Sequence, residues 1–368
     1  VTTGTEFTQN TTIYALWKVR ESGGSSGGGN SGSSGSTTET TQNPDGSTTT
    51  TVTRPDGSTT ETTEKPDGSQ EVVSTDKDGT VTTTTTDPEG NKTEIVEKTD
   101  GSSQTTVTNE DGSSSVTVSG QDGQSETQVK LPDAVTDNAE EKGEAVKLPM
   151  PAIPVASDSK TASTVTVDLP AGKSAKVEIP VENPAAGTVA ILVKEDGSEE
   201  IIKTSVAGES GVLVTLQDGD KVKIVDNSKD FTDVSDSYWG TEAIDFASSR
   251  EMMNGVGNNS FAPDSNLSRG MIAQVLYNLE DAPEAGSDAF GDVEAGQWYA
   301  DAVNWAAAND IVSGYDDSTF GPQKDITREQ MAQILYNYAV FKGYDISAQG
   351  DLSAFGDGSE TSDWALPA

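Results

Sequence analysis

The sequence predicts a multidomain α+β protein with three successive parts. A Thr/Ser-rich stalk, either disordered or a thin β ribbon, comes first; a small antiparallel β-sandwich or barrel follows; α-helical repeats come last. Three observations support this order. Glycines recur every eleven residues over 37–130, apolar and polar residues alternate over 161–229, and helix signals repeat 59 residues apart from 231 onward. A length of 368 residues fits two or three domains.

The composition excludes several classes of function. There are 23 basic and 61 acidic residues, for a net charge of −38. This charge argues against a nucleic acid or an anionic membrane surface as a partner, because both attract clustered Lys and Arg. The absence of Cys and His excludes thiol catalysis, Ser-His-Asp triads and Cys/His zinc sites. Carboxylates, Lys, Tyr and Ser remain as catalytic groups, but the carboxylates lie in tails and turns without a cleft-forming domain, so we expect no catalysis. We also expect no cofactor, no metal site and, since no apolar run approaches 18 residues, no membrane insertion.

Residues 1–20 are predicted to be the end of a truncated β-repeat, because strand-type residues alternate up to Trp17. The string TIYALWK at 12–18 resembles the end of the Listeria–Bacteroides (internalin B-type) repeat of cell-surface proteins. An ordinary β-hairpin ending in aromatic residues explains the string equally well. Residues 21–36 are a Gly/Ser-rich flexible linker by composition. A start at Val1, without Met or a secretory segment, leads us to expect a fragment.

Residues 37–130 are an eleven-residue repeat in which each glycine follows Asp or Glu. The glycines are Gly46, Gly57, Gly68, Gly79, Gly90, Gly101, Gly112 and Gly123. Asp-Gly favours tight turns, and the Thr-rich stretches between them favour extended backbone. However, ten aliphatic residues in this region cannot offset the ordering entropy of about 1–2 kcal/mol per residue. The two forms of the stalk therefore stay open, and the spacing does not match a calcium-binding repeat.

Residues 131–160 are predicted to be an acidic linker, because prolines interrupt them repeatedly. In residues 161–229, apolar side chains then occur at every second position in about six short segments. Examples are Val165/Val167 and Val177/Ile179. Turn signals separate these segments, so we expect a small antiparallel sandwich or barrel that acts as a structural spacer.

The C-terminal region contains a repeat of 59 residues. Phe231 recurs as Phe290, and Arg269 recurs as Arg328. Further matched pairs are Asp233/Asp292, Trp239/Trp298, Gly255/Gly314, Phe261/Phe320, Pro263/Pro322 and Leu276/Leu335. A third start includes Asp357 and Trp364. We predict repeats at 231–289 and 290–350, with a truncated third at 355–368.

Each repeat reads F-x-D-V, Trp, a helix, G-(x)5-F-x-P and then (I/L)-(S/T)-R before a second helix. This combination resembles the S-layer homology (SLH) module of the bacterial cell surface. The resemblance implies helical modules that assemble as three prongs and bind secondary cell wall polysaccharide, typically at a terminal pyruvylated sugar. The usual (I/L)TRAE motif reads LSRGM at 267–271 and ITREQ at 326–330, so its final acidic residue is missing from both.

Capping signals predict where the helices begin and end. Ser268 and Thr327 are predicted N-caps of the second helix in each repeat, and Thr327 with Gln330 fits a capping box. Gly255 and Gly314 are predicted C′ glycines of the first helix.

The two repeated arginines are candidate ligand-binding residues. Arg269 and Arg328 fall at the first helical position, where the helix dipole disfavours a cation, although residues 231–368 contain just five basic residues. Helix N-terminal N–H groups and a guanidinium together suit a carboxylate such as a ketal pyruvate. The alternative is that each arginine pairs with a nearby carboxylate, for instance Asp264 or Asp325.

Repeated aromatic and acidic residues complete the candidate site, together with Gly255 and Gly314. The tryptophans either stack on a sugar ring or belong to the core; they are Trp239, Trp298 and Trp364. The aspartates either accept bonds from sugar hydroxyls or cap the first helix; they are Asp233, Asp292 and Asp357.

The sequence thus predicts a non-catalytic anchor on the outside of a bacterial cell, with secondary cell wall polysaccharide as its partner. The alternative is the anchoring region of an extracellular polysaccharide-degrading enzyme or of an adhesin, whose active domain lies upstream of Val1. Five basic and 23 acidic residues give residues 231–368 a net charge of −18, which opposes an anionic polymer. We therefore expect affinity to rise with salt or divalent cations.

Overall fold

The structure of the protein is a computed structural model that describes residues 35–348 and 350–368. The predicted β-repeat at 1–20 and nearly all of the linker at 21–36 lie outside the described residues. The chain forms two compact units. Among the described residues, the first contains 35–185 together with 190–226, and the second contains 186–189 with 227–348 and 350–368. The α+β class is confirmed.

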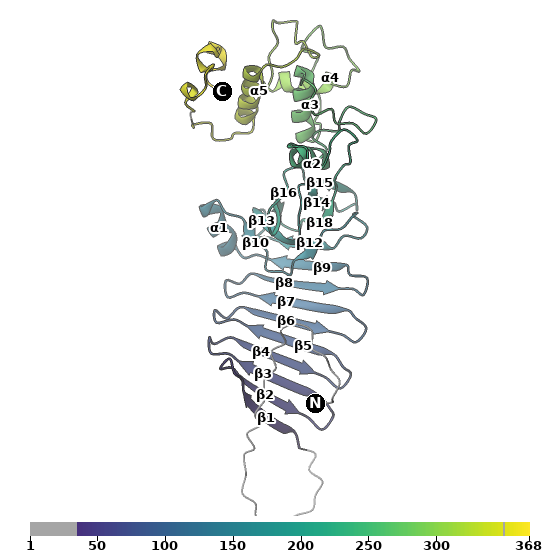
Figure 1. The fold of residues 1–368 in the computed structure, drawn as a ribbon, viewed down its shortest axis with the longest axis vertical. Coiled ribbons are helices and arrows are strands. Elements are labelled where there is room, and N and C mark those ends of the chain that lie inside the picture. Colours follow the sequence, from purple (N-terminus) through teal and green to yellow (C-terminus); the bar gives the residue numbers. More distant parts are fainter. Residues whose placement is uncertain (1–34, 349) are drawn as a thin grey trace, which may run out of the picture. The chain divides into compact units, whose positions relative to one another are not determined.

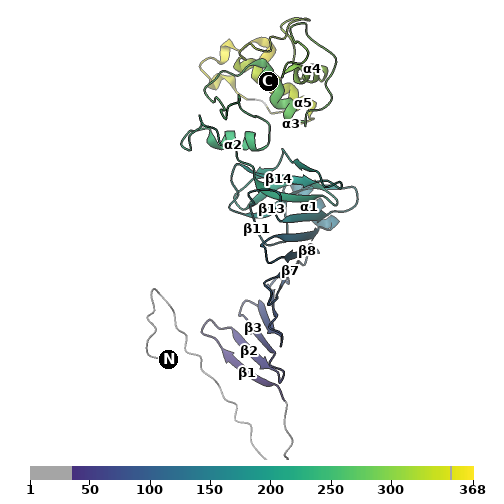
Figure 2. The ribbon, with the colours of Figure 1, turned by 90° about the vertical axis from the view of Figure 1, so that its right-hand side faces the viewer.

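The first unit begins with nine six-residue strands that pair antiparallel in sequence order (Figures 1 and 2). They are β1 (Thr37–Gln42), β2 (Thr48–Thr53), β3 (Thr59–Glu64), β4 (Gln70–Thr75), β5 (Val81–Thr86), β6 (Lys92–Glu97), β7 (Ser103–Thr108), β8 (Ser114–Ser119) and β9 (Ser125–Lys130). Each turn contains its Asp-Gly or Glu-Gly pair. In the first, Gly46 has φ +86°, a conformation that favours glycine, and Asp45 accepts a bond from the Ser47 N–H. Of the two predicted alternatives, the structure therefore has the β form.

These strands form a sheet without a core over most of its length. Within β1–β7 no apolar side chain is buried. Threonine pairs connect neighbouring strands instead, as where the Thr49 and Thr63 hydroxyl oxygens lie 2.9 Å apart. β-branched residues suit an extended backbone, and cross-strand pairs add a few tenths of a kcal/mol to about 1 kcal/mol each. Within the strands, burial begins at β8 and β9, where Ser115 and Val129 are covered.

The rest of the first unit forms two sheets around one core. Its elements are α1 (Asp133–Lys142), β10 (Val146–Lys147), β11 (Ile153–Pro154), β12 (Thr164–Asp168), β13 (Ser174–Glu182), β14 (Thr188–Val193), β15 (Glu199–Ile201), β16 (Val206–Ala207), β17 (Gly211–Gln217) and β18 (Lys221–Asp226). The nine strands continue through β12, β18, β14 and β15 into one 13-stranded sheet; β10, β13, β17, β16 and β11 form the second sheet. The predicted alternating residues fill the core, with Val165 in one sheet and Val177 and Ile179 in the other.

Two expectations for this unit were wrong. Residues 131–160 are not a linker, because Leu131, Leu148 and Ile153 are buried in the core, and the segment contains α1, β10 and β11. The sheets are also not purely antiparallel. β12 pairs parallel with β9, and β10 and β11 pair parallel with β13. The apolar residues between the prolines follow neither a helical nor a strand period. Their burial could therefore not be predicted from the sequence pattern, and the prolines and acidic residues favoured a linker.

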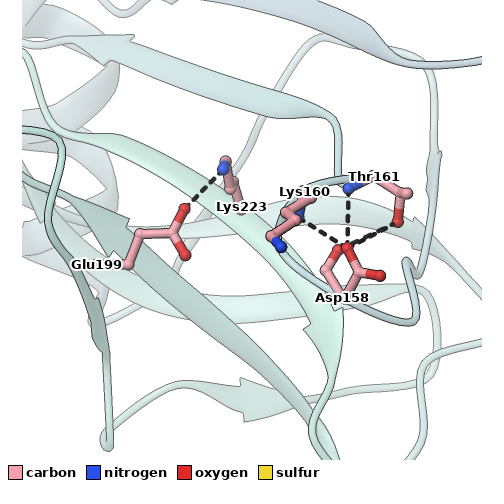
Figure 3. Close-up of polar contacts among 5 residues, drawn as sticks. All are labelled: Asp158, Lys160, Thr161, Glu199 and Lys223. Atoms are coloured by element: carbon pink, nitrogen blue, oxygen red, sulfur yellow. Dashed lines mark hydrogen bonds and ion pairs between the residues drawn. The ribbon is translucent and has the colours of Figure 1, made fainter.

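Local polar contacts fix the loop before β12 (Figure 3). Asp158 Oδ1 accepts bonds from the Lys160 N–H at 2.8 Å and the Thr161 N–H at 3.1 Å, and these bonds lower the pKa of Asp158. Nearby, Lys223 donates to Glu199 at 2.7 Å. The Asp158 bonds hold the turn in which they occur, and the Lys223–Glu199 pair connects β18 to β15, so both have a structural explanation.

The second unit contains two helix pairs that repeat at the predicted spacing. They are α2 (Thr241–Ser249) with α3 (Arg269–Leu279), and α4 (Ala300–Ala308) with α5 (Arg328–Phe341); three short 3₁₀ turns follow, η1 (Leu352–Ala354), η2 (Gly358–Glu360) and η3 (Asp363–Ala365). α3 packs on α4, and Leu276, Ala306 and Phe320 are buried in their shared core. In the part of the chain that the structure describes, no helix is long and apolar enough to cross a membrane.

Candidate functional site

The second helix of each repeat begins where the capping signals predicted. The Ser268 hydroxyl accepts a bond from the Met271 N–H at 3.2 Å, and the Thr327 hydroxyl accepts from the Gln330 N–H at 3.3 Å. These bonds confirm both N-caps. The Gln330 side chain does not complete the predicted capping box, since its Oε1 accepts a bond from Arg269 at 3.4 Å. Both repeats therefore place an arginine at the first position of a helix, as predicted.

Arg269 is 5% exposed, and its guanidinium is surrounded by the second repeat. Nε donates to the Phe320 carbonyl at 2.9 Å and Nη2 donates to the Ser313 carbonyl at 2.6 Å. The group also lies over the Phe320 ring, 4.5 Å from its centroid. Burial lowers the pKa of Arg269, and the charge of Asp292 opposes that shift. In this structure the side chain thus binds carbonyls, not the predicted Asp264 or Asp325.

Backbone of the second repeat also covers the N-terminus of α3. The Arg269 N–H donates to the Lys324 carbonyl at 3.0 Å, and the Gly270 N–H donates to the Pro322 carbonyl at 2.8 Å. A Cβ on Gly270 would come within 2.9 Å of that Pro322 oxygen. The departure from the usual motif at this position therefore permits a close approach of two backbones. With these two bonds and the Ser268 cap, the first three N–H groups of α3 already have partners.

The equivalent surface of α5 is open. Arg328 is exposed and makes no hydrogen bond or ion pair with the residues that the structure describes. The N–H groups of Arg328 and Glu329 likewise have no partner within that part of the chain. The Glu329 carboxylate accepts a bond from the Ser362 N–H at 3.1 Å, which connects the start of α5 to the segment that precedes Trp364. Of the two predicted arginines, Arg328 is the one whose donors are available.

The repeated aspartates fix a loop and do not cap a helix. Asp292 accepts bonds from the Phe320 and Gly321 N–H groups, both at 2.8 Å, and Asp233 accepts from Phe261 and Ala262 at the same distances. The predicted capping role was wrong because α2 and α4 begin some eight residues later. Asp357 is exposed and its side chain does not cap η2. A sugar-binding role for the three aspartates stays a prediction.

The three repeated tryptophans lie at the surface. The exposed fractions of Trp239, Trp298 and Trp364 are 89%, 56% and 51%. Trp298 lines a groove of about 840 Å³ together with Gly255 and the side chain of Met271. Asp292 lines a second cavity, of about 420 Å³, with Lys324. Three of the predicted residues thus line a hollow, Trp298 and Gly255 the larger one and Asp292 the smaller one. The core alternative for the tryptophans was wrong.

Comparisons with known proteins assign the repeats to a family. Residues 230–270 and 289–332 match the S-layer homology domain. The chain contains two S-layer homology repeats. Its relatives include a surface-layer 125 kDa protein of Lysinibacillus sphaericus, 31% identical over 35% of this chain and 10% of the relative. An exoglucanase XynX of Acetivibrio thermocellus is 31% identical over 42% of this chain and 14% of the relative.

A cellulosome-anchoring protein of Acetivibrio thermocellus is 29% identical over 28% of this chain and 25% of the relative. The chain therefore spans a quarter or less of the length of these three relatives. No solved structure matches it. The SLH repeats and the names of these relatives support a cell-surface location and an anchoring role for residues 230–332.

The glycines of the SLH repeats do not end the first helices, so that prediction was wrong. α2 and α4 end at Ser249 and Ala308, and the residues with positive φ that follow are Glu251 and Asp310. The glycines occur later, where the chain passes an aromatic ring. A Cβ on Gly314 would come within 2.6 Å of the Phe290 ring and 2.4 Å of the Asp316 carbonyl oxygen. A side chain at Gly255 would meet the Phe231 ring in the same way.

One buried cation in the first SLH repeat was missed by sequence reasoning. Arg250 is fully buried, donates to the Ala186 and Thr188 carbonyls at 3.0 and 2.9 Å, and lies over the Phe246 ring. Burial lowers its pKa to about 10. It has no counterpart in the second repeat, where Asn309 stands, so the spacing of 59 could not reveal it. The available signal was the scarcity of basic residues in this region.

No metal cluster accompanies these residues. Over residues 35–348 and 350–368, no group of three or more Asp or Glu side chains is arranged to hold a metal ion. What the SLH region does present is exposed aromatic rings and one available guanidinium, which are groups suited to binding a ligand.

Proposed function

We propose that the SLH repeats hold this protein non-covalently on the cell wall by binding secondary cell wall polysaccharide, with a pyruvylated sugar as the bound unit. Arg328 and the start of α5 would receive the pyruvate carboxylate. The observation that carries this proposal is the availability of Arg328, which is exposed and unpaired among the described residues despite an excess of nearby acidic groups. An anionic ligand explains a cation at a helix N-terminus, which the helix dipole otherwise disfavours.

A sugar ring would bind by stacking on a tryptophan. Trp298 is half exposed and lines the larger groove, whose walls include Met271 and the backbone at Gly255. An aromatic face beside apolar walls suits the C–H face of a pyranose, because it removes apolar surface from water while the sugar hydroxyls stay solvated. Trp364 comes two residues after Ser362, whose N–H donates to Glu329, and it would stack in the same way on a sugar whose carboxylate binds Arg328.

The test is a pull-down of the full chain with purified cell-wall sacculi, with and without their secondary polysaccharide. Retention is expected to disappear with the polysaccharide and to fall at least tenfold in Arg328→Ala. Arg54→Ala is the matched control, because Arg54 is an exposed arginine in a turn of the first unit. Retention that is unaffected both by removal of the polysaccharide and by Arg328→Ala would contradict the proposal.

Ionic strength gives a second readout. Because residues 231–368 have a net charge of −18, repulsion from an anionic polymer should weaken as salt screens it. We expect retention of the full chain to rise between about 10 mM and 150 mM salt, which shortens the screening length from about 30 to 8 Å. A steady fall over that range would indicate simple charge attraction and would contradict this expectation.

We also propose that residues 1–20 end a β-repeat of the Listeria–Bacteroides type, which favours an adhesin as the protein to which the anchor belongs. The alternative is a surface enzyme, since one relative of the SLH region is named an exoglucanase. Amide hydrogen exchange of the full chain tests the repeat. Protected amides between residues 11 and 18 would support it, and free exchange there would contradict it.

A further inference from the structure

The strands β1–β7 have a construction that distinguishes them from the rest of the first unit. Each strand pairs over all six residues with its neighbours, and every turn repeats the same two backbone bonds. No apolar side chain of these seven strands is buried, so pairing between neighbouring strands is their main connection. Turns on the same edge add contacts such as the bond from the Glu110 N–H to Asn91 Oδ1 at 3.0 Å. Such an array has a stability that is approximately a sum over identical repeats, and each repeat can open separately.

The register determines how a pulling force would act on this array. Thr37 lies in a column of directly paired residues that crosses the sheet through Thr53 and Thr59 and reaches Ser125 in β9. Glu126, the next residue, aligns through Thr164 with Lys223 in β18.

The two ends of the first unit therefore lie across the sheet from each other. β18 ends at Asp226, three residues after Lys223. Ten strand spacings separate β1 from β18 in the sheet, which is about 48 Å, whereas the offset along the strands is two residues, about 7 Å. A force applied through the chain at Thr37 and Asp226 therefore runs nearly along the inter-strand hydrogen bonds. In this geometry the bonds of the edge strand β1 break one after another, not all at once.

The far end of the array resists this opening. β8 and β9 are covered by the second sheet, where the Ser115 hydroxyl donates to the Pro149 carbonyl and Val129 is fully buried. Opening these strands would expose the core that also contains Val165 and Ile179. Peeling should therefore proceed from β1 and stop at β8.

From this geometry we propose that β1–β7 are a force-extensible tether, which lengthens by peeling strands singly while the sandwich stays folded. Each released repeat of eleven residues adds about 37 Å of extended chain and removes one strand spacing, for a net gain of about 32 Å. Seven repeats give about 220 Å. Because each repeat pairs with its sequence neighbour, it should reform quickly when the load falls. That the load arises at the cell surface rests on the proposed anchoring function.

Single-molecule pulling tests the tether without any cell wall, so its failure is distinct from failure of anchoring. The sequence has no Cys, which allows handles on the full chain at Ser36→Cys and Asp230→Cys alone. We expect a series of small reversible extensions of about 32 Å each at low force, followed by one separate and larger event at higher force when the sandwich unfolds. A single rupture that releases residues 37–226 together would overturn the proposal.

A deletion supplies the matched control. Removal of residues 54–75 takes out β3 and β4 with their turns, and it joins β2 to the turn before β5 with strand direction and faces preserved. The total low-force extension should fall by two steps, about 64 Å, while the high-force event stays unchanged. An unchanged low-force extension, or a weaker high-force event, would contradict independent peeling.

Discussion

The starts of α3 and α5 have equivalent sequences but different surroundings. Arg269 is 5% exposed and binds two carbonyls, whereas Arg328 is exposed. Two helical turns after these arginines, Leu276 is 3% exposed and Leu335 is 46% exposed. The local sequence determines where both helices begin, but the segment that follows each repeat determines what is buried. α3 is followed by α4, which packs on it, and α5 by the short turns η1–η3.

This difference indicates a division of labour between the two repeats. Where α4 and the loop around Pro322 cover α3, the arginine stabilises the interface between repeats. At α5 the short turn η3 packs on the helix, and the arginine at the same motif position stays exposed with its donors unpaired among the described residues. If this division holds, substitutions on α3 should cost much more stability than the equivalent substitutions on α5, and the loss of the buried leucine should cost the most.

Leu276→Ala should destabilise the second unit by about 3 kcal/mol, because it leaves a cavity between α3 and α4. Leu335→Ala should cost less than about 1 kcal/mol, since nearly half of that side chain already meets water. Urea unfolding followed by the fluorescence of the buried Trp305 measures both. Equal losses would mean that the surfaces of α3 and α5 are covered alike in solution.

Arg269→Ala should destabilise the same unit by about 2–3 kcal/mol, because the buried Phe320 carbonyl and the partly buried Ser313 carbonyl lose their donor. Arg328→Ala should change stability by less than about 0.5 kcal/mol, as is usual for an exposed residue. The same urea measurement applies, with Arg269→Lys as a control that keeps the charge but loses the planar fork. A stable Arg269→Ala variant that no longer binds sacculi would mean that Arg269 binds the ligand and does not hold the repeats together.

Gly270→Ala should destabilise by about 1–3 kcal/mol, although alanine is the better helix former. The new methyl group would lie 2.9 Å from the Pro322 carbonyl oxygen and 3.3 Å from the Tyr299 side chain, so two repeats would have to separate. Glu329→Ala, at the equivalent position of α5, should cost less than about 1 kcal/mol, since it loses one partly buried bond from the Ser362 N–H and meets no backbone. Thermal unfolding followed by circular dichroism of the two variants decides the matter, and a stabilised Gly270→Ala would show that the loop moves aside.

Sequence reasoning succeeded where a signal and its structural effect are close along the chain. Ser268 and Thr327 cap the helices that follow them, and the turn glycines such as Gly46 adopt positive φ. It failed where a partner comes from far along the sequence. Asp233 bonds to residues 28 and 29 positions later, and the carbonyls bound by Arg269 belong to the next repeat. Neither the spacing of the repeats nor the conformational propensity of single residues predicts those long-range pairs.

The smallest expected effect concerns the aspartate clamp of the first repeat. Bonds from the Phe261 and Ala262 N–H groups hold the pKa of Asp233 below its ordinary value. Because the pKa is lower in the folded state, the clamp stabilises the unit fully above the unfolded value of about 3.9, and this contribution is lost as the pH falls through the folded value.

The urea midpoint of the native sequence should therefore fall between pH 4.5 and pH 2.5 by more than that of Asp233→Asn, whose amide does not titrate and presents an N–H to one of the two donors. Asp264→Asn is the control, because Asp264 is exposed and follows the same loop. If Asp233→Asn and Asp264→Asn change the pH profile equally, the loop is held by its backbone and ring contacts, and the clamp contributes nothing of its own.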